Sequence, residues 1–411
     1  MKYDFDQTVD RRNTRCFKWD LNKVNFKRED IISMWVADMD LPAAPEITEV
    51  IINRAKHPVY GYSFRDNRFY NAYINWQKHR NNWQIKRDWI VNSNSVVTSL
   101  CLILQALTAP EDKVLINSPV YGQFALAVSG SGRTLVTSPL RNNEGYYTPD
   151  FQDMENKFRS GIAAFILCSP HNPVGRVWKE EELRLMAELC LKYNVLLISD
   201  EIHSDLIFSE SHHIPIASLS EDISRITVTC TSPGKTFNVS GMCIGFVIIE
   251  NKILREKVKD IFTSSHLLAA SIFAIEACQA AYEKGERWLS EMLGYLQTNR
   301  DYLVKFIRTE IPSLKVYTPE GTYLAWIDFR LLHLSQSDLL CFLVFAAGLG
   351  LDNGTKFGEE GRGFMRLNFA CSFSLLQHAL HNLAAAVKEL QSNDLDIKKL
   401  IKESEVIEDC D

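Results

Sequence analysis

Three segments of the sequence place reactive side chains shortly after short apolar runs. The runs cover residues 163–168, 195–199 and 226–230. The groups that follow them are an amide, a carboxylate with a histidine three residues on, and a lysine: Asn172, Asp200 with His203, and Lys235. Their separations, from 172 to 200 and from 200 to 235, suit successive βαβ units of about 30 residues. Since open parallel sheets bind ligands beyond the carboxyl ends of their strands, we expect these groups to meet at one edge.

A lysine near a carboxylate and an amide suits the capture of an aldehyde cofactor. The amine of Lys235 would form a Schiff base with pyridoxal phosphate, and Asp200 would keep the pyridine nitrogen of that cofactor protonated. Asn172 and His203 would hydrogen-bond to the phenolic oxygen of the ring. The hydroxyl groups of residues 231–232, with backbone N–H groups, would hold the phosphate. The residues alone therefore predict a pyridoxal-phosphate site.

The elements that must position these groups alternate between apolar strands and amphipathic helices. Residues 180–193 carry apolar side chains at helical spacing between two of the apolar runs, and residues 245–249 form a further run. Near-continuous apolar strands that alternate with helices predict an α/β fold with a mainly parallel sheet covered on both faces.

The pattern of predicted helices and strands changes after about residue 285, which predicts a second domain. There a long helical pattern at 288–308 precedes a strand pattern at 323–329, and helix and loop follow. The predicted units are a large cofactor-binding domain (46–285), a smaller α+β domain (286–392) joined by the amino-terminal segment (1–45), and an acidic tail (393–411).

Composition excludes several classes of protein. The 411 residues carry a net charge of −6, which argues against a nucleic-acid-binding protein held by bulk charge. No apolar run reaches the roughly 18 residues that a membrane span needs, and the charged amino terminus does not resemble a signal peptide. The ten cysteines are scattered singly, which favours reduced thiols over disulfides or zinc ligands. We expect a cytoplasmic protein with no membrane or nucleic-acid partner.

Three other interpretations fit the sequence less well. Residues 234–236 imitate the end of a nucleotide P-loop, but Thr229 stands where the first glycine should be. Residues 348–354 resemble a dinucleotide-binding loop with one residue too many, and a turn explains them better. The cluster that runs from His203 to residues 212–213 matches no common metal-ligand spacing, so no metal site is predicted.

The order of motifs resembles that of fold-type I pyridoxal-phosphate enzymes of the class I/II aminotransferase superfamily. Within it, the chain is similar to the cystathionine β-lyase and C–S lyase branch, the MalY/PatB-like proteins, over residues 1–392. The resemblance rests on eight segments in order: MWVADMD (34–40), YGY (60–62), SPVYGQF (118–124), CSPHNPVGRVW (168–178), SDEIHSDLIF (199–208), PGKTFN (233–238), PEGTYLAWIDF (319–329) and FGEEGRGFMRLNFA (357–370). It implies a large domain with a mainly parallel seven-stranded sheet beside a smaller α+β domain.

The resemblance also implies roles for residues around the cofactor ring. Lys235 binds the cofactor covalently and later moves the α-proton of the substrate, and Asp200 pairs with the pyridinium nitrogen. Asn172 and His203 contact the phenolic oxygen. Tyr121 stacks on the ring and also lines the substrate site.

Further implied roles concern the phosphate and the subunit arrangement. Backbone N–H groups of Ser95, Val96 and Val97, at the start of a helix, would bind the phosphate together with the hydroxyl of Ser232. Tyr62 would reach the phosphate of a neighbouring subunit. The resemblance thus implies a homodimer whose sites are shared between subunits.

The substrate side of the site follows the family pattern with some departures. Arg366 would bind the α-carboxylate of the substrate as a bidentate partner. Similar lyases usually have serine where this chain has Gly234, and a PGVVPA loop where residues 94–99 read NSVVTS. Lys356 stands where a tryptophan is common, so it adds positive charge at the predicted substrate entrance.

The function that the resemblance implies is β-elimination from a sulfur-containing L-amino acid, giving a thiol, pyruvate and ammonia. An aminotransferase on the same scaffold is the first alternative, because the proton can instead return to the cofactor carbon. A regulatory binding protein of the MalY type is a second alternative, and no surface feature of the sequence indicates its partner.

Overall fold

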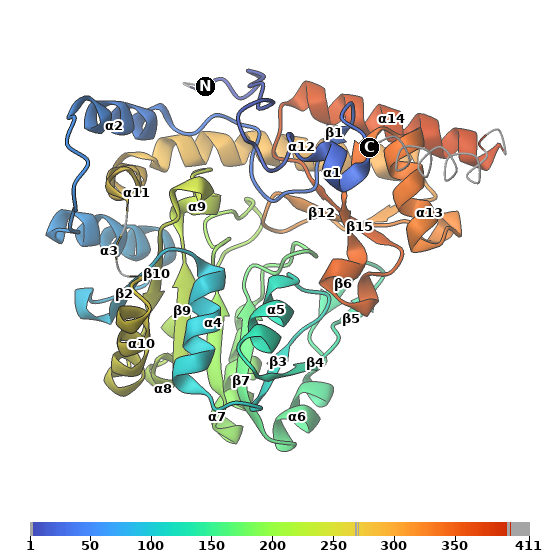
Figure 1. Cartoon of the computed structure of the whole chain (residues 1–411). Coiled ribbons are helices and arrows are strands. Elements are labelled where there is room, and N and C mark those ends of the chain that lie inside the picture. Colours follow the sequence, from blue (N-terminus) through green and yellow to red (C-terminus); the bar gives the residue numbers. More distant parts are fainter. Residues whose placement is uncertain (1–2, 268, 270, 393–394, 396–411) are drawn as a thin grey trace.

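A seven-stranded sheet forms the centre of the molecule (Figure 1), a computed structural model that describes residues 3–267, 269, 271–392 and 395. In order across the sheet, the strands are β2 (Ile90–Ser93), β10 (Gly245–Ile248), β9 (Thr227–Thr231), β8 (Leu196–Asp200), β7 (Ile162–Cys168), β3 (Lys113–Ile116) and β4 (Thr134–Thr137). β10 is antiparallel to both neighbours, and the other pairs are parallel. The predicted α/β class and the mainly parallel sheet are confirmed.

Helices cover both faces of this sheet. One face packs against α4 (Val96–Leu107), α5 (Gln123–Gly130) and α10 (Lys252–Ser264). The other packs against α6 (Phe151–Arg159), α7 (Glu180–Tyr193), α8 (Glu221–Ile226), α3 (Asn67–Asn81) and α11 (Ile272–Lys284). Successive residues of β7 point to opposite faces, so Ile166 joins the first cluster while Phe165 and Leu167 join the second. Because both faces are buried at the centre of the sheet, β7 is apolar along its whole length, whereas the edge strand β4 is largely exposed.

Local sequence signals set the ends of the helices that flank the site. Ser95 caps α4, since its side chain accepts a hydrogen bond from the backbone N–H of Thr98 at 3.1 Å. α7 begins with three glutamates, which suit the positive end of a helix, and stops at Asn194 in the left-handed conformation. The bounds of α7 agree with the predicted helix at 180–193.

A second, four-stranded sheet lies beside the first. Its strands, in spatial order, are β11 (Lys315–Val316), β12 (Leu324–Asp328), β15 (Phe364–Asn368) and β14 (Asp352–Asn353). The helices α12 (Glu286–Glu310), α13 (Gln336–Cys341) and α14 (Phe373–Gln391) accompany it. The prediction of helix and loop after residue 329 was wrong for β15. Its short apolar pattern is interrupted by Arg366, and its pairing with β12 is a long-range contact that local periodicity does not report.

The amino-terminal segment runs across the second sheet. β1 (Ile32–Ser33) pairs in parallel with β13 (Leu349–Gly350), and α1 (Asn22–Phe26) precedes it. The remaining elements are α2 (Pro45–Lys56), the hairpin of β5 (Arg141–Asn143) and β6 (Tyr146–Thr148), and α9 (Pro233–Thr236). The domain boundaries near 45, 285 and 392 stay predictions, and nearly all of the proposed acidic tail at 393–411 lies outside the described residues.

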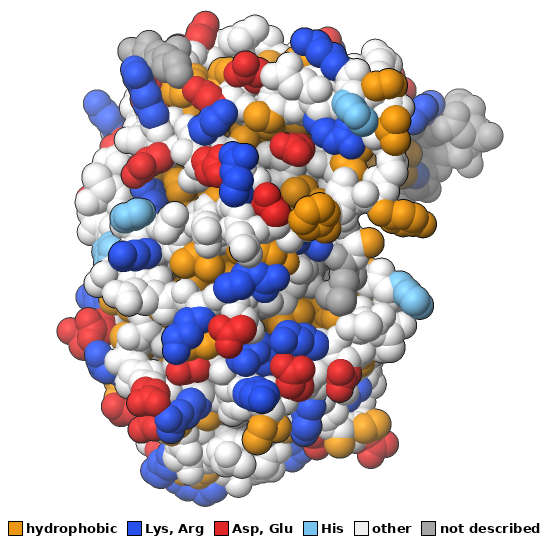
Figure 2. All heavy atoms as spheres, turned by 90° about the vertical axis from the view of Figure 1, so that its left-hand side faces the viewer, with side chains coloured by type: hydrophobic (Ala, Val, Ile, Leu, Met, Phe, Trp, Pro, Cys, Tyr) orange, Lys and Arg blue, Asp and Glu red, His pale blue; other side chains and the backbone are white. Residues whose placement is uncertain are grey.

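The loop between α2 and α3 presents large hydrophobic side chains to the surface. Val59, Tyr60, Tyr62 and Phe64 are all exposed. The loop lies at the left of Figure 1, on the side that faces the viewer in Figure 2, where hydrophobic groups lie among charged side chains of both signs. None of the helices in the described part of the chain combines the length and apolar character that a membrane span requires.

Candidate active site

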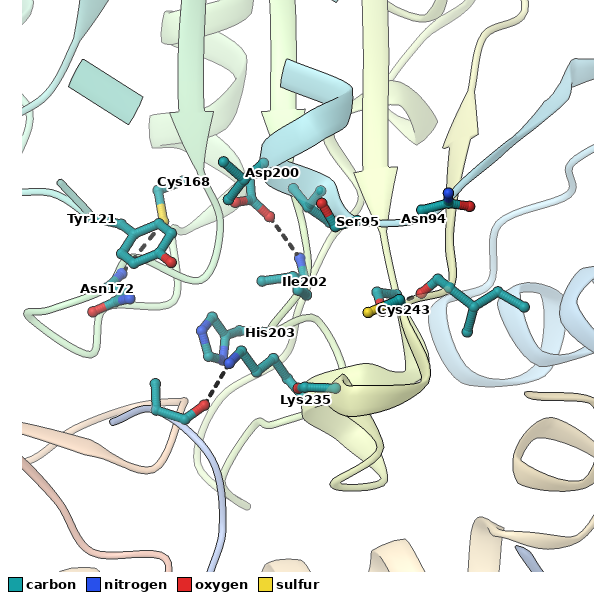
Figure 3. A pocket seen from close by; sticks show the side chains of 16 residues that line it. Asn94, Ser95, Tyr121, Cys168, Asn172, Asp200, Ile202, His203, Lys235 and Cys243 are labelled. Carbon is teal, nitrogen blue, oxygen red and sulfur yellow. Dashed lines mark hydrogen bonds between the residues drawn. The ribbon is translucent and has the colours of Figure 1, made fainter. Parts of the chain in front are cut away.

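The carboxyl ends of β7, β8 and β9 open into one cavity. Its solvent-accessible volume is about 180 Å³. All the predicted site residues line it except Tyr62 and Arg366: Ser95, Val96, Val97, Tyr121, Asn172, Asp200, His203, Ser232 and Lys235. Figure 3 shows the side chains of Asp200, His203 and Lys235 projecting into this space from neighbouring elements. The expectation that the three strand exits converge is therefore met.

Lys235 extends from α9 into the cavity. Its Nζ donates a hydrogen bond to the backbone carbonyl of Ala37 (Figure 3). The same carbonyl accepts a hydrogen bond from the hydroxyl of Tyr323 at 2.9 Å. Burial of the amine lowers the pKa of Lys235 to about 8, although the carboxylate of Asp38 opposes that shift. A usable fraction of the amine is therefore neutral, and nucleophilic, near neutral pH.

Asp200 ends β8 and is almost fully buried. Its Oδ1 accepts a hydrogen bond from the backbone N–H of Ile202 at 3.0 Å. Burial raises the pKa of Asp200 to about 7, because a charged carboxylate is poorly solvated there. A cation placed beside this carboxyl would bring its pKa down again and would gain a buried ion pair.

His203 supplies a neutral ring beside Lys235. Burial lowers the pKa of His203 to about 3, and the positive charges of Lys235 and Arg366 lower it further. The ring packs edge-on against Tyr323, with ring centroids 6.0 Å apart. The buried Nδ1 of His203 has no hydrogen-bond partner within the described residues, so a polar group of a ligand could satisfy it.

Asn172 and Tyr121 lie together on the side of the cavity nearest β7 (Figure 3). The backbone N–H of Tyr121 donates to the backbone carbonyl of Asn172 at 3.1 Å. The Oδ1 of Asn172 accepts from Nη1 of Arg366 at 3.1 Å, which leaves its amide N–H groups as donors. Arg366 is thus next to the cavity wall although it does not line the cavity itself.

Arg366 and Lys356 share one carboxylate. Nη2 of Arg366 donates to Oδ2 of Asp352 at 2.7 Å and to the carbonyl of Trp35 at 2.7 Å, while its buried Nε has no partner among the described residues. Nζ of Lys356 lies 3.1 Å from Oδ1 of Asp352. Two cations and one anion leave this cluster with a net positive charge.

The amino terminus of α4 lies at the wall of the cavity, where Ser95, Val96 and Val97 line it. The first intrahelical bond joins the N–H of Ser99 to the carbonyl of Ser95, so the N–H groups of Val96 and Val97 precede it and have no helical acceptor. The backbone N–H of Ser95 instead donates to the hydroxyl of Ser93 at 3.2 Å. A phosphate group is therefore expected to bind through Val96 and Val97.

Comparison with known proteins identifies the family. The family model for class I and II aminotransferases matches residues 30–383. The chain belongs to this family. The cystathionine β-lyase PatB of Bacillus subtilis is 39% identical, over 93% of this chain and 100% of PatB. Protein MalY of Escherichia coli is 31% identical, over 95% of this chain and 100% of MalY.

Solved structures agree with this membership of the aminotransferase family. Cystalysin from Treponema denticola, whose crystal structure contains a pyridoxal 5'-phosphate cofactor, is 34% identical with a TM-score of 0.92, over 95% of this chain and 100% of cystalysin. The resemblance to the MalY/PatB branch is confirmed.

The residues of this family member fit the cofactor. An aldehyde requires a partly neutral amine, and a pyridinium nitrogen requires a buried carboxyl that gains from a nearby cation. A phenolic oxygen suits the unsatisfied imidazole nitrogen, and a phosphate suits the helix amino terminus. Each lies in the same cavity.

Tyr62 is placed differently from the other predicted residues. It lies in the loop between α2 and α3, is fully exposed, and does not line the cavity. Within one chain it has no role in the site, so its predicted contact with a neighbouring subunit stays a prediction.

Sequence reasoning missed several residues of the site. Ala37 contributes only a carbonyl oxygen, and a motif of side-chain chemistry cannot indicate that role. Asp352 stands in β14, far in sequence from the residues with which it pairs. Ser240 and Cys243 line the cavity just after the lysine motif. Their only signal was their distance of a few residues from Lys235.

Proposed function

We propose that this protein is a pyridoxal-phosphate-dependent carbon–sulfur lyase. It eliminates a thiol from the β-carbon of a sulfur-containing L-amino acid, and hydrolysis of the remaining three-carbon fragment gives pyruvate and ammonia. The observation that carries this reaction class is the similarity of nearly the whole chain to the cystathionine β-lyase PatB. The groups that line the cavity, and the cofactor present in cystalysin, support the cofactor assignment.

The chain's own residues would hold the cofactor at its aldehyde carbon, ring nitrogen, phenolic oxygen, ring face and phosphate. Lys235 and Asp200 bind the aldehyde carbon and the ring nitrogen, while Asn172 and His203 hydrogen-bond to the phenolic oxygen. Tyr121 covers the face of the ring. The backbone N–H groups of residues 96–97 bind the phosphate, and the hydroxyl of Ser232, which donates to the carbonyl of Ile244, lines the same cavity. When bound, the cofactor supplies an electron-accepting ring for the negative charge that forms at the α-carbon.

Two basic side chains then act on the substrate. Arg366 binds the α-carboxylate through its unpartnered Nε and so orients the α-carbon. The amine of Lys235, once displaced by the amine of the substrate, takes the α-proton. Its lowered pKa favours the neutral form that this step requires. The sulfur leaves from the β-carbon as a thiolate, and Lys235 can protonate it because the amine then carries the proton taken from the α-carbon.

An assay of products tests the reaction. The holoprotein is incubated with L-cystathionine and, separately, L-cystine, and pyruvate, free thiol and new 2-oxo acids are measured together. We expect pyruvate and a sulfur product in equal amounts without any added 2-oxo acid. Transamination would instead require a 2-oxo acid acceptor and would convert it to an amino acid. If no sulfur amino acid yields pyruvate while acceptor-dependent transfer occurs, the protein is an aminotransferase.

The pKa of Lys235 predicts how attachment of the cofactor depends on pH. Only the neutral amine attacks an aldehyde, and a group with a pKa of about 8 goes from roughly one tenth neutral at pH 7 to nine tenths at pH 9. The initial rate at which cofactor-free protein is reconstituted should therefore rise about tenfold over this interval and then level off. An ordinary lysine would give a rise of about a hundredfold with no plateau. Stopped-flow absorbance of the protein-bound cofactor measures the rate, with pyridoxal as a control for ionisation of the phosphate.

Lys356 is expected to assist substrate binding and not the chemical step. Its side chain is 61% exposed and pairs with Asp352, which also pairs with Arg366. Because Lys356 partly neutralises that carboxylate, the positive charge of Arg366 attracts the substrate carboxylate more strongly. Lys356→Met should raise KM about two- to fivefold, less at high salt, with kcat unchanged, since exposed ion pairs contribute little. Lys305→Met, an exposed lysine on α12, is the matched control and should change neither value. A fall in kcat without a change in KM would contradict this role.

We also infer a homodimer. The loop between α2 and α3 exposes Val59, Tyr60, Tyr62 and Phe64, an apolar group that a second copy of the chain would cover. In this arrangement Tyr62 reaches the phosphate end of the neighbouring site, and each site is completed by both subunits.

A further inference from the structure

We propose that Ser240 is a phosphate-binding residue whose hydroxyl contacts the phosphate group of the cofactor. This inference rests on the proposed cofactor but not on the proposed elimination reaction. It identifies a ligand for a phosphate monoester at a position that none of the sequence motifs singled out.

The other hydroxyl groups at the phosphate end of the cavity are already engaged. The hydroxyl of Ser232 donates its single proton to the carbonyl of Ile244 at 2.7 Å and accepts from the N–H of Gly234 at 3.0 Å. It can donate to a phosphate only if it gives up its bond to Ile244. The hydroxyl of Ser95 donates to Oγ1 of Thr98 at 2.8 Å and caps α4.

Ser240 is in a different position. It lines the same cavity, close in sequence to Cys243 and Ile244, which line it as well. Ser240 is exposed, and its Oγ makes no hydrogen bond to another residue in the part of the chain that the structure describes, so a ligand in the cavity can accept its proton. The segment is held near the lysine because the N–H of Val239 donates to the carbonyl of Gly234 at 3.0 Å.

Gly234 provides the space that Ser240 occupies. A Cβ at residue 234 would lie 3.1 Å from Oγ of Ser232, 3.1 Å from Oγ of Ser240 and 3.2 Å from Cα of Ser240, all tighter than ordinary van der Waals contact. Gly234 does not adopt a left-handed backbone, so its conformation alone does not demand glycine. A side chain at residue 234 would therefore crowd the hydroxyl groups of both Ser232 and Ser240, and glycine there leaves the hydroxyl of residue 240 in its place beside the cavity.

The test compares two forms of the cofactor that differ only in the phosphate. The dissociation constants of pyridoxal phosphate and of pyridoxal are measured by dialysis of the loaded protein and its variants. Ser240→Ala should weaken binding of pyridoxal phosphate about ten- to a hundredfold, because it removes a hydrogen bond to a charged group, and should leave pyridoxal unchanged. Ser129→Ala, an exposed serine on α5, is the matched control and should change neither constant.

A double variant tests the competition for space. Gly234→Ser alone should weaken pyridoxal phosphate binding, because the new side chain displaces Ser240. In the Ser240→Ala background the same change should weaken binding of pyridoxal phosphate less than it does in the wild type, because the contact with Oγ of Ser240 is gone while those with Oγ of Ser232 and Cα of residue 240 remain. The proposal is overturned if Ser240→Ala alters neither constant, or weakens pyridoxal and pyridoxal phosphate equally, which a purely structural role would do. Failure of the lyase assignment would appear separately, as normal cofactor affinity without pyruvate formation.

Discussion

Replacement of Lys235 by alanine is expected to reduce C–S elimination by at least about 10³-fold, because it removes both the covalent attachment and the base that takes the α-proton. The variant should still bind pyridoxal phosphate without a covalent bond, since the helix amino terminus and Asp200 remain. Pyruvate formation measures the loss. Borohydride reduction followed by peptide mapping should label the peptide of Lys235 in the wild type and leave it unlabelled in the variant.

Lys235→Arg is the control for charge. Arginine keeps a positive side chain of similar length, but its guanidinium does not deprotonate in proteins, so it cannot serve as a base or nucleophile. We expect this variant to be as inactive as Lys235→Ala, with a melting temperature close to that of the wild type. Substantial activity in either variant would show that the reacting amine lies elsewhere and would remove the basis of the proposed function.

Substitution of Asp200 by asparagine is expected to lower kcat by on the order of 10²- to 10³-fold. The shape of the side chain is kept, but its charge is lost, and loss of one partner of a buried ion pair costs about 3–5 kcal/mol. The measurement combines kcat for pyruvate formation with the dissociation constant of the cofactor. Glu201→Gln is the matched control, because Glu201 is a buried neighbouring carboxylate that pairs with His213 and does not line the cavity.

The same substitution should have the opposite effect on the stability of the cofactor-free protein. The pKa of Asp200 is raised to about 7 in the fold, above its ordinary value of 3.8, so its charged form is disfavoured there. The free-energy cost of burying the charged carboxylate is absent below pH 3.8, where Asp200 is protonated in both the folded and the unfolded chain. It is fully present above pH 7, where the carboxylate is charged in both. Asp200→Asn should therefore raise the melting temperature at pH 8 and have little effect near pH 4. A fall in both activity and stability at pH 8 would contradict burial as the cause of the shift.

Much of the large sheet could be predicted from local sequence. Residues 163–168 lie within β7, and residues 195–199 and 226–230 overlap β8 and β9 in all but their first residue. These central strands are almost wholly buried, which makes them rich in apolar and β-branched residues and easy to recognise. Parallel connections bring their carboxyl ends to one edge, so the meeting of Asn172, Asp200 and Lys235 followed from chain order. In contrast, β15 was missed, because a charged residue in its centre breaks the apolar pattern.

The sequence by itself determined the reactive groups and the order of the strands that carry them, because side-chain chemistry and burial periodicity are local properties of the chain. Only the tertiary structure decided how each group is engaged. It brought the carbonyl of Ala37 to Lys235, paired Arg366 with Asp352, and engaged the hydroxyl of Ser232 while leaving that of Ser240 available. These pairings join residues whose distance in sequence carries no information about contact, and the same contacts and burial set the pKa values and the available donors.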